Sequence, residues 1–344
     1  TPDATYFYSI GTPSVALAVG PDFTFTTSPP TGTPKPTRLW VLGDSGTKNA
    51  NAAAVRTAYE KYSATHRADL VLMLGDNAYD TGTDAEYQAA VFDMYPQVLR
   101  RTVLWPTLGN HDTAQSPDPP LTIPYFQMFT LPVRGEAGGV ASGTEKYYSF
   151  DYANIHFICL DSMTSSRAAD GPMATWLKAD LAGTLQPWII AFWHHPPYTK
   201  GSHDSDRESN LVEMRQNMLP LLEAGGVDLV MAGHSHSYER SFLLHGHYGL
   251  SNSLAPDMKL DGGDGREQGT GAYRKAASAD HAKGAVYITA GSSGQISGGP
   301  LNHPAMFISL NKLGSLVLDV HGPRLDARFL RENGDIDDSF TLLK

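Results

Sequence analysis

Five short apolar segments of this sequence end in the same way, with polar residues that include Asp, Asn, His or Tyr. The segment 70–74 is one of them, and it is followed closely by Asp76 and Tyr79. An apolar run that stops so abruptly is typical of a buried strand that delivers polar side chains to one edge of a sheet. The five polar ends cover residues 43–46, 75–79, 109–112, 194–198 and 233–238.

Each of these polar ends has an ordinary explanation when it is taken alone. A Gly-Asp pair after a strand is most often a helix N-cap or a turn, and an Asn-His-Asp stretch is usually a polar loop. Five such ends in one chain are hard to ascribe to chance. Because the carboxyl ends of the strands in an α/β sheet share one edge, the five loops can converge on a single site. Glycine before the polar residue lets the backbone turn sharply and approach a ligand.

The order of the predicted elements agrees with such a sheet. From residue 38 onward, strands alternate with helices, which predicts βαβ units and an α/β fold. The expected strands are 39–43, 70–74, 103–108, 188–193 and 229–232, with a hairpin-like pair at 147–151 and 155–161. The expected helices are 51–66, 84–100, 172–181 and 207–224. Beyond residue 240 the pattern is mostly β, with strands expected at 285–290, 316–320 and 327–330.

Residues 1–36 have a different pattern from the rest. Segments 4–11 and 23–27 alternate like strands, and a linker rich in Pro, Thr and Gly follows. Two strands do not form a stable sheet alone. They are either the last strands of a β-sandwich of the fibronectin type III kind or an extension that packs on the main domain. We therefore expect a boundary between residues 1–36 and a second domain, 37–344.

Composition excludes several classes of protein. The formal net charge of −10 argues against a nucleic-acid backbone as the main partner, because such binding depends on an excess of Lys and Arg. No apolar run approaches the ~18 residues of a membrane span, and no signal peptide is visible, so the chain is either cytosolic or a mature form without its leader. Cys159 is the only cysteine, which excludes an intramolecular disulfide and a cysteine-cluster metal site.

The polar ends together offer a chemically coherent set of metal ligands. Two carboxylates, one amide oxygen, three imidazoles and a phenol make seven candidates without a thiolate. They are Asp44, Asp76, Asn110, His194, His234, His236 and Tyr79. Seven ligands are too many for one tetrahedral ion but fit two octahedral ions that share a carboxylate. Two ions ~3.5 Å apart form a clamp for in-line displacement at phosphorus.

These motifs, in this order, resemble those of the calcineurin-like metallophosphoesterases. Tyr79 makes the chain similar in particular to the purple acid phosphatases, and residues 233–240 are close to the plant-type version of the last motif. The resemblance covers residues 38–300 or so. It implies a four-layer α/β/β/α sandwich, and a preceding β-sandwich, which is usual in the plant-type proteins, supports that interpretation of residues 1–36. It also implies a secreted or periplasmic mature protein.

The resemblance implies a role for each candidate ligand. Asp44, Tyr79 and His236 would hold ferric iron, and Asp76 would bridge to the second ion. That ion would be Zn, Fe or Mn in the divalent state, held by the remaining ligands, which are Asn110, His194 and His234.

The expected activity is that of an acid phosphomonoesterase, in which a metal-bound hydroxide attacks phosphorus in line with the leaving group. His111 matches the histidine that contacts the substrate phosphate, and His203 or His195 would assist it. The third motif ends in Asp112 where many relatives carry Glu. The expected partner is a phosphorylated small molecule. Two alternatives stay open: a phosphodiesterase of the same superfamily, acting on cyclic nucleotides or phospholipid headgroups, and a non-catalytic metal-binding surface module.

Overall fold

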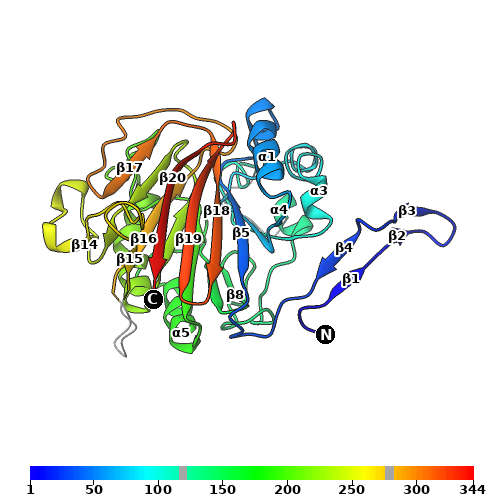
Figure 1. Cartoon of the computed structure of the whole chain (residues 1–344), viewed down its shortest axis with the longest axis horizontal. Coiled ribbons are helices and arrows are strands. Elements are labelled where there is room, and N and C mark those ends of the chain that lie inside the picture. The colour runs from blue at the N-terminus through cyan, green and yellow to red at the C-terminus, as the bar shows by residue number, and fades with distance from the viewer. Residues whose placement is uncertain (116–121, 276–282) are drawn as a thin grey trace.

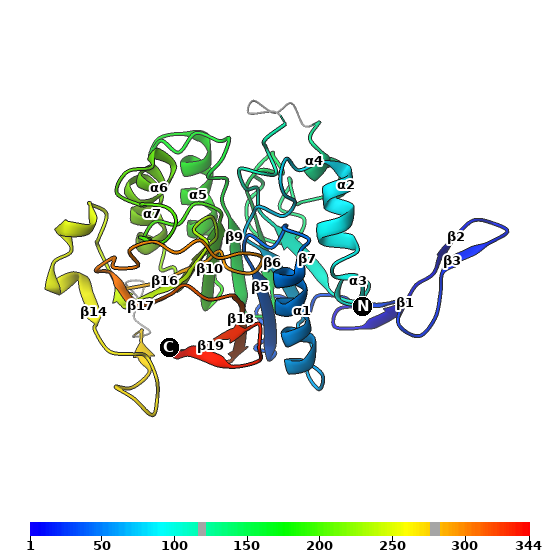
Figure 2. The same cartoon turned by 90° about the horizontal axis from the view of Figure 1, so that it is seen from above.

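The computed structural model describes residues 1–115, 122–275 and 283–344. Two seven-stranded sheets form the middle of the molecule, and helices lie on their outer sides (Figures 1 and 2). A large apolar cluster contains residues of both sheets, such as Leu72 and Phe157, and so forms the core between them. This arrangement confirms the predicted α/β fold with four layers, α/β/β/α.

The first sheet combines parallel and antiparallel strands. Its order is β15-β20-β19-β18-β5-β6-β7, and β5, β6 and β7 run parallel to one another. The bounds are β5 Thr37–Leu42, β6 Leu70–Met73, β7 Val103–Pro106, β15 Tyr273–Arg274, β18 Gly314–His321, β19 Arg324–Arg331 and β20 Ile336–Leu343. Strands β18, β19 and β20 form an antiparallel meander, in which β18 pairs with β5.

The second sheet has a parallel centre and antiparallel edges. Its order is β17-β12-β16-β11-β10-β9-β8, with β9, β10, β11 and β16 parallel. The bounds are β8 Tyr148–Tyr152, β9 Ile155–Cys159, β10 Trp188–Trp193, β11 Leu229–Ala232, β12 Tyr238–Ser241, β16 Val286–Ala290 and β17 Met306–Leu310. Beside it, β13 (Leu243–Leu244) pairs with β14 (Lys259–Asp261).

Strand β10 shows how the layers are held together. Ile190 and Phe192 belong to the apolar cluster between the sheets, whereas Ile189, Ala191 and Trp193 belong to the cluster under the outer helices. This alternation of side chains between two apolar faces is expected of a strand buried on both sides. The outer helices on this side are α5 (Pro172–Gly183), α6 (Ser209–Glu213) and α7 (Leu219–Ala224) (Figure 2).

The other outer layer begins with α1 (Ala50–Tyr62), which Asn49 caps through hydrogen bonds from the backbone N–H groups of Asn51 and Ala52. The indole of Trp40 on β5 stacks on Tyr59 of α1, with ring centroids 3.9 Å apart. The short helices of this side are α2 (Asp84–Tyr87), α3 (Pro96–Leu99) and α4 (Pro124–Met128).

Two predicted helices are shorter and less regular than expected. The segment 84–100 divides into α2, a π-helical turn η1 (Gln88–Phe92) and α3, which begins at Pro96. The segment 207–224 likewise contains a π-helical turn, η2 (Met214–Met218), before α7. Proline near the start of α3 and of α7 removes a backbone donor, so a continuous α-helix through either point is disfavoured.

The N-terminal segment forms a two-stranded arm that extends from the body (Figures 1 and 2). Strand β1 (Thr5–Phe7) pairs with β4 (Thr24–Thr26), and β2 (Ile10–Gly11) pairs with β3 (Ala16–Ala18). The base of the arm contacts the main body where Tyr8 Oη donates to the carbonyl oxygen of Arg100 at 2.9 Å. The four strands are consistent with a small β unit, and the boundary at residues 36 and 37 stays a prediction.

Within the described ranges, no helix is long and apolar enough to cross a membrane.

A buried histidine fixes the loop that precedes β8. His156 on β9 is fully buried, and its two ring nitrogens lie 2.8 Å from Asp151 and 2.9 Å from Asp180. Burial by itself would lower the pKa of His156, but the hydrogen bonds to the two carboxylates outweigh burial and raise that pKa to about 9. Asp180 also accepts from the backbone N–H of Val140 at 2.7 Å, so the charged imidazole supports this loop indirectly.

The raised pKa of His156 predicts a loss of stability in mildly alkaline solution. Its contribution is fully present below about pH 6.5 and is lost as the pH rises to about 9, because the unfolded chain releases the proton first. We expect the free energy of unfolding to fall by up to ~3 kcal/mol from this group over that range. Denaturant unfolding at several pH values measures it. An unchanged pH dependence in the His156→Gln variant would contradict the assignment.

Candidate metal centre

The five polar ends meet at one edge of the sandwich. Strands β5, β6 and β7 of the first sheet and β10 and β11 of the second all direct their carboxyl ends there. The structure brings together the seven predicted ligands, which are Asp44, Asp76, Tyr79, Asn110, His194, His234 and His236. They come from both sheets, so the site depends on how the two sheets pack on each other.

Three of these residues have a strained backbone. Asp44, Asp76 and His234 have φ angles of 54°, 52° and 66°, in the left-handed region that non-glycine residues rarely adopt. Such strain costs about 1–3 kcal/mol per residue and concentrates at functional sites. It directs side chains from adjacent loops toward one point: the backbone N–H of His234 donates to Asp44 Oδ2 at 2.7 Å.

One group of donor atoms surrounds the phenol of Tyr79. Its oxygen lies 3.1 Å from Asp44 Oδ1, 3.0 Å from Asp76 Oδ2 and 3.4 Å from Nε2 of His236. The other ring nitrogen of His236, Nδ1, lies 2.8 Å from Ser297 Oγ, so Nε2 is the nitrogen that this ring presents to the group.

A second group of donor atoms forms a triangle. Asn110 Oδ1 lies 3.0 Å from Nε2 of His194 and 3.0 Å from Nδ1 of His234, and these two nitrogens are 3.2 Å apart. Adjacent ligands of an octahedral ion with bonds of ~2.1 Å are separated by ~3.0 Å. The spacing of the triangle therefore suits three ligands of one ion.

Asp76 lies between the two groups. Its Oδ2 contacts the Tyr79 phenol at 3.0 Å, whereas its Oδ1 lies 3.5 Å from Nε2 of His194. Asp44, Asp76 and His194 are all buried and each offers a ligand atom within 4.8 Å of the others. A carboxylate placed in this way can serve two ions at once.

The protonation pattern of the triangle also favours a cation. Nδ1 of His194 lies 2.8 Å from the carbonyl oxygen of Leu74, which only accepts, so this nitrogen carries the proton. Nε2 of the neutral ring then has a lone pair. Nε2 of His234 faces the carboxylate of Glu208 at 3.3 Å, so its Nδ1 has a lone pair too. Two lone pairs 3.2 Å apart repel unless a positive charge lies near both.

The pKa shifts of Asp44 and Tyr79 in the first group also favour a bound cation. Burial alone would raise the pKa of Asp44, but the hydrogen bond with His236 and the nearby His194 hold that pKa below its usual range. Burial and the charges of Asp44 and Asp76 raise the pKa of the Tyr79 phenol. Without a cation the phenol keeps its proton, so it can act as a phenolate ligand only when a metal ion lies beside it, and the residues present fit a metal centre.

All three predicted catalytic histidines border this centre, but only His111 and His203 are accessible to solvent. The ring of His111 lies beside that of Tyr79, with centroids 4.2 Å apart, and its Nδ1 lies 2.6 Å from the carbonyl oxygen of Asp80. The ring of His203 packs against that of His234, with centroids 3.7 Å apart and the ring planes tilted by 30°. The side chains of His111 and His203 are about one third exposed, 33% and 29%. Both side chains are therefore accessible to a ligand that enters the centre from solvent.

The third histidine, His195, is buried beside the ring of His234, with centroids 4.3 Å apart. Only 4% of it is exposed, and its Nδ1 lies 2.9 Å from the hydroxyl of Ser162. Burial and the neighbouring His234 and His194 hold the pKa of His195 well below its ordinary value. These contacts favour His203 over His195 as the second histidine at the substrate.

The sequence alone did not identify several residues at the site. Glu208 contacts both His203 and His234, and Gln295 Nε2 lies 3.1 Å from Nε2 of His236. Asp112, the last residue of the third motif and already named from the sequence, is buried and accepts from the side chain of Asn77 at 3.0 Å. Glu208 follows His203 by five residues, and this spacing in a polar loop carries no recognisable signal.

The chain belongs to the calcineurin-like phosphoesterase family, whose sequence profile matches residues 37–238, more than half of its length. Its curated relatives include plant purple acid phosphatases, which confirms the resemblance inferred from the motifs. Purple acid phosphatase 18 from Arabidopsis thaliana is 29% identical over 78% of this chain and 56% of that protein. Purple acid phosphatase 1 from Ipomoea batatas is 31% identical over 70% of this chain and 49% of that protein.

A solved structure supports the same fold. Purple acid phosphatase PPD1 from seeds of yellow lupin (Lupinus luteus) superposes with a TM-score of 0.66 at 17% sequence identity. The match covers 93% of this chain and 56% of the lupin chain. This chain spans about half the length of the curated relatives that it matches.

The close approach of Gly109 to Asp76 predicts that a single methyl group disrupts the centre. A Cβ on Gly109 would overlap both the backbone nitrogen and Oδ1 of Asp76. We expect Gly109→Ala to lower metal affinity by about tenfold or more, although no ligand is removed. Elemental analysis after dialysis against a weak chelator measures it.

Gly262→Ala is the matched control for this substitution, because a Cβ on Gly262 meets nothing within 4 Å. Equal metal content in the two variants would contradict the predicted role of Gly109.

Proposed function

We propose that this chain is a dinuclear-metal phosphatase that hydrolyses phosphomonoesters, of the acid phosphatase type. The observation that carries the proposal is the pair of donor groups joined by Asp76 and bordered by two accessible histidines, His111 and His203. Family membership and the purple acid phosphatases among the relatives support it.

The two groups of donor atoms differ in chemistry, and this difference supports the binding of a different ion by each group. The first contains a phenol and two carboxylates, hard oxygen donors that suit ferric iron; it comprises Asp44, Asp76, Tyr79 and His236. The second offers an amide oxygen and two imidazoles besides the shared carboxylate, which suit a divalent Zn, Fe or Mn ion; it comprises Asp76, Asn110, His194 and His234. When bound, the ions would acidify water and neutralise the charge that develops on the phosphoryl group.

The chain's own residues position the substrate and move the proton. The Nδ1 atom of His111 is engaged by the carbonyl oxygen of Asp80, so Nε2 is the nitrogen available to the phosphoryl oxygens. Nδ1 of His203 is engaged by Glu208, which likewise leaves Nε2 available. One of the two stabilises the equatorial oxygens, while the other takes up a proton on Nε2 and donates it to the leaving alkoxide. We place His203 in the second role and His195 in a supporting one.

The substrate class follows from charge and from the relatives. A phosphorylated small molecule, rather than nucleic acid, agrees with the net charge of −10. No observation favours the phosphodiesterase alternative or a non-catalytic metal-binding module. A secreted or periplasmic location stays a prediction.

Comparison of two substrates tests the proposed reaction. We expect kcat/KM for p-nitrophenyl phosphate to exceed that for bis-p-nitrophenyl phosphate by about tenfold or more, because a monoester presents more unesterified oxygens to the centre. A preference for the diester would favour the phosphodiesterase alternative. Absence of hydrolysis of both esters by the metal-loaded chain would contradict the proposal.

The phenol of Tyr79 gives a test of the ferric site that does not depend on substrate. A phenolate on ferric iron should give a broad visible absorption band, and Tyr79→Phe should abolish it because the ligand oxygen is removed. Tyr62→Phe on α1 is the control and should keep the band. If Tyr79→Phe leaves both colour and iron content unchanged, the assignment of this ligand is wrong.

A further inference from the structure

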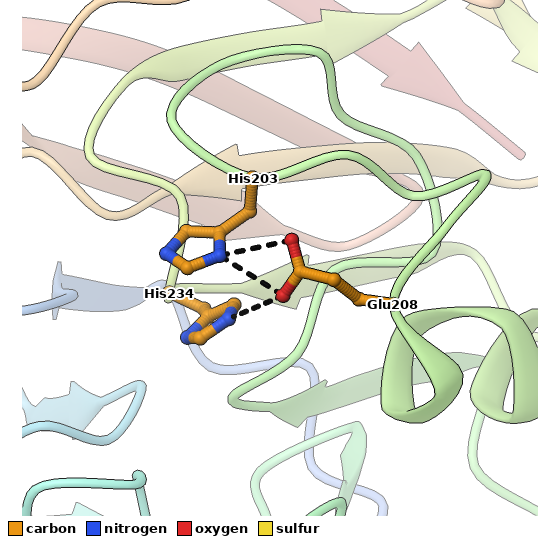
Figure 3. Close-up of side chains that lie close together, drawn as sticks. All are labelled: His203, Glu208 and His234. Atoms are coloured by element: carbon orange, nitrogen blue, oxygen red, sulfur yellow. Dashed lines mark hydrogen bonds and ion pairs between the residues drawn. The ribbon is translucent and has the colours of Figure 1, made fainter.

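One carboxylate contacts two histidines of the centre through different nitrogens (Figure 3). Glu208 Oε2 lies 3.3 Å from Nε2 of His234, and both oxygens of Glu208 lie 3.0 Å from Nδ1 of His203. The backbone N–H of Asp204 donates to Oε1 at 3.0 Å and so holds the carboxylate in place. Glu208 immediately precedes α6, at the border of the centre.

The contacts of Glu208 determine which nitrogen of each ring carries the proton. An ionised carboxylate only accepts hydrogen bonds, so each nitrogen that faces it must donate. In a neutral ring the other nitrogen then keeps its lone pair. For His234 that nitrogen is Nδ1, which lies 3.0 Å from Asn110 Oδ1 and 3.2 Å from Nε2 of His194.

The same argument applies to the second ring. His203 directs Nδ1 to Glu208, and its Nε2 points away from the carboxylate (Figure 3). His236 lies near this ring, with the two centroids 6.4 Å apart. The lone pair, or the proton, of His203 Nε2 is therefore available on the face where a ligand of the centre would approach.

We propose that Glu208 is a positioning residue that fixes the tautomers of His234 and His203 together. It makes His234 present Nδ1 to the ion of the second donor group, and it makes His203 present Nε2 to the substrate. The second half rests on the proposed function, whereas the first half requires only that the triangle binds a divalent ion. Carboxylate partners of metal-binding histidines commonly act in this way.

The geometry argues against a third metal ion between these residues. Their ligand atoms do lie within 4.8 Å of one another. A cation there would need the Nε2 lone pair of His234 in addition to the Nδ1 lone pair used in the triangle, and a neutral imidazole has only one. The centroids of the two rings also lie only 3.7 Å apart, with the ring planes tilted by 30°, so the rings lie against each other rather than spread around a point.

Glu208→Gln tests the proposal with little change in shape. The amide keeps one acceptor oxygen and gains an NH2 donor. In either orientation the NH2 meets another donor, the backbone N–H of Asp204 where it replaces Oε1 or Nε2 of His234 where it replaces Oε2. We expect the affinity of the triangle for Zn²⁺ to fall about tenfold to a hundredfold, measured by competition with a chelator. Equal Zn²⁺ affinity in this variant and in the control below would overturn the proposal.

The control is Glu213→Gln, at the other end of α6. Glu213 pairs with Arg167 at 2.8 Å, and its carboxylate is 44% exposed. We expect this variant to keep the wild-type Zn²⁺ affinity. A wild-type chain that binds one more equivalent of Zn²⁺ than Glu208→Gln does, with the remaining affinities unchanged, would overturn the proposal in favour of a third metal site.

A spectroscopic readout separates this proposal from the proposed function. In ¹⁵N spectra of the histidine rings, the wild-type chain should show His234 protonated at Nε2 and His203 at Nδ1, and Glu208→Gln should shift at least one ring to the other tautomer. This result is expected even if the chain hydrolyses no phosphomonoester. If the tautomers are the same in both proteins, Glu208 does not set them and the proposal is wrong.

Discussion

The carboxylates of Asp44 and Asp76 are buried against the phenol of Tyr79, at the edge where the strands of both sheets end. The arrangement of the other side chains of the centre depends on this burial. Removing a carboxylate from water is costly unless positive charge or hydrogen bonds replace the water. Here the neighbours are imidazoles whose free nitrogens face inward, together with backbone N–H groups such as that of His111, 2.9 Å from Asp76 Oδ1. Metal ions can bind the buried carboxylates and the inward imidazole nitrogens at the same time, which protons alone do not do.

The fold provides what this burial requires. Parallel strands of both sheets end at one edge, so ligands that are up to 192 positions apart in the sequence, Asp44 and His236, become neighbours. The strained φ angles of Asp44, Asp76 and His234 are maintained because the strands before them are locked in the core. Around this centre, Glu208 and Ser297 each engage the outward nitrogen of a ligand histidine, so the other nitrogen of each ring faces inward.

Much of the fold and of the centre could be predicted because apolar strands and polar ends are visible locally. Strands 70–74 and 188–193 are continuous apolar runs, and the ligands directly follow them. Strand β12 was not predicted, since it carries the polar residues Glu239 and Arg240. Both are buried and find partners far away in the sequence: Asp338 lies 2.5 Å from Arg240 Nε, and Ser309 donates to Glu239. Glu208 was missed for the same reason: its partners His203 and His234 are brought together only by tertiary structure.

The central claim is that Asp76 serves two ions, and metal stoichiometry tests it most directly. Elemental analysis of the purified chain should give two metal ions per molecule, and the Asp76→Asn variant should lose both because the shared ligand is weakened at each site. Asn110→Ala should lose only the divalent ion, since its oxygen belongs to the triangle alone. One ion per wild-type chain, or two ions retained by Asp76→Asn, would contradict the account.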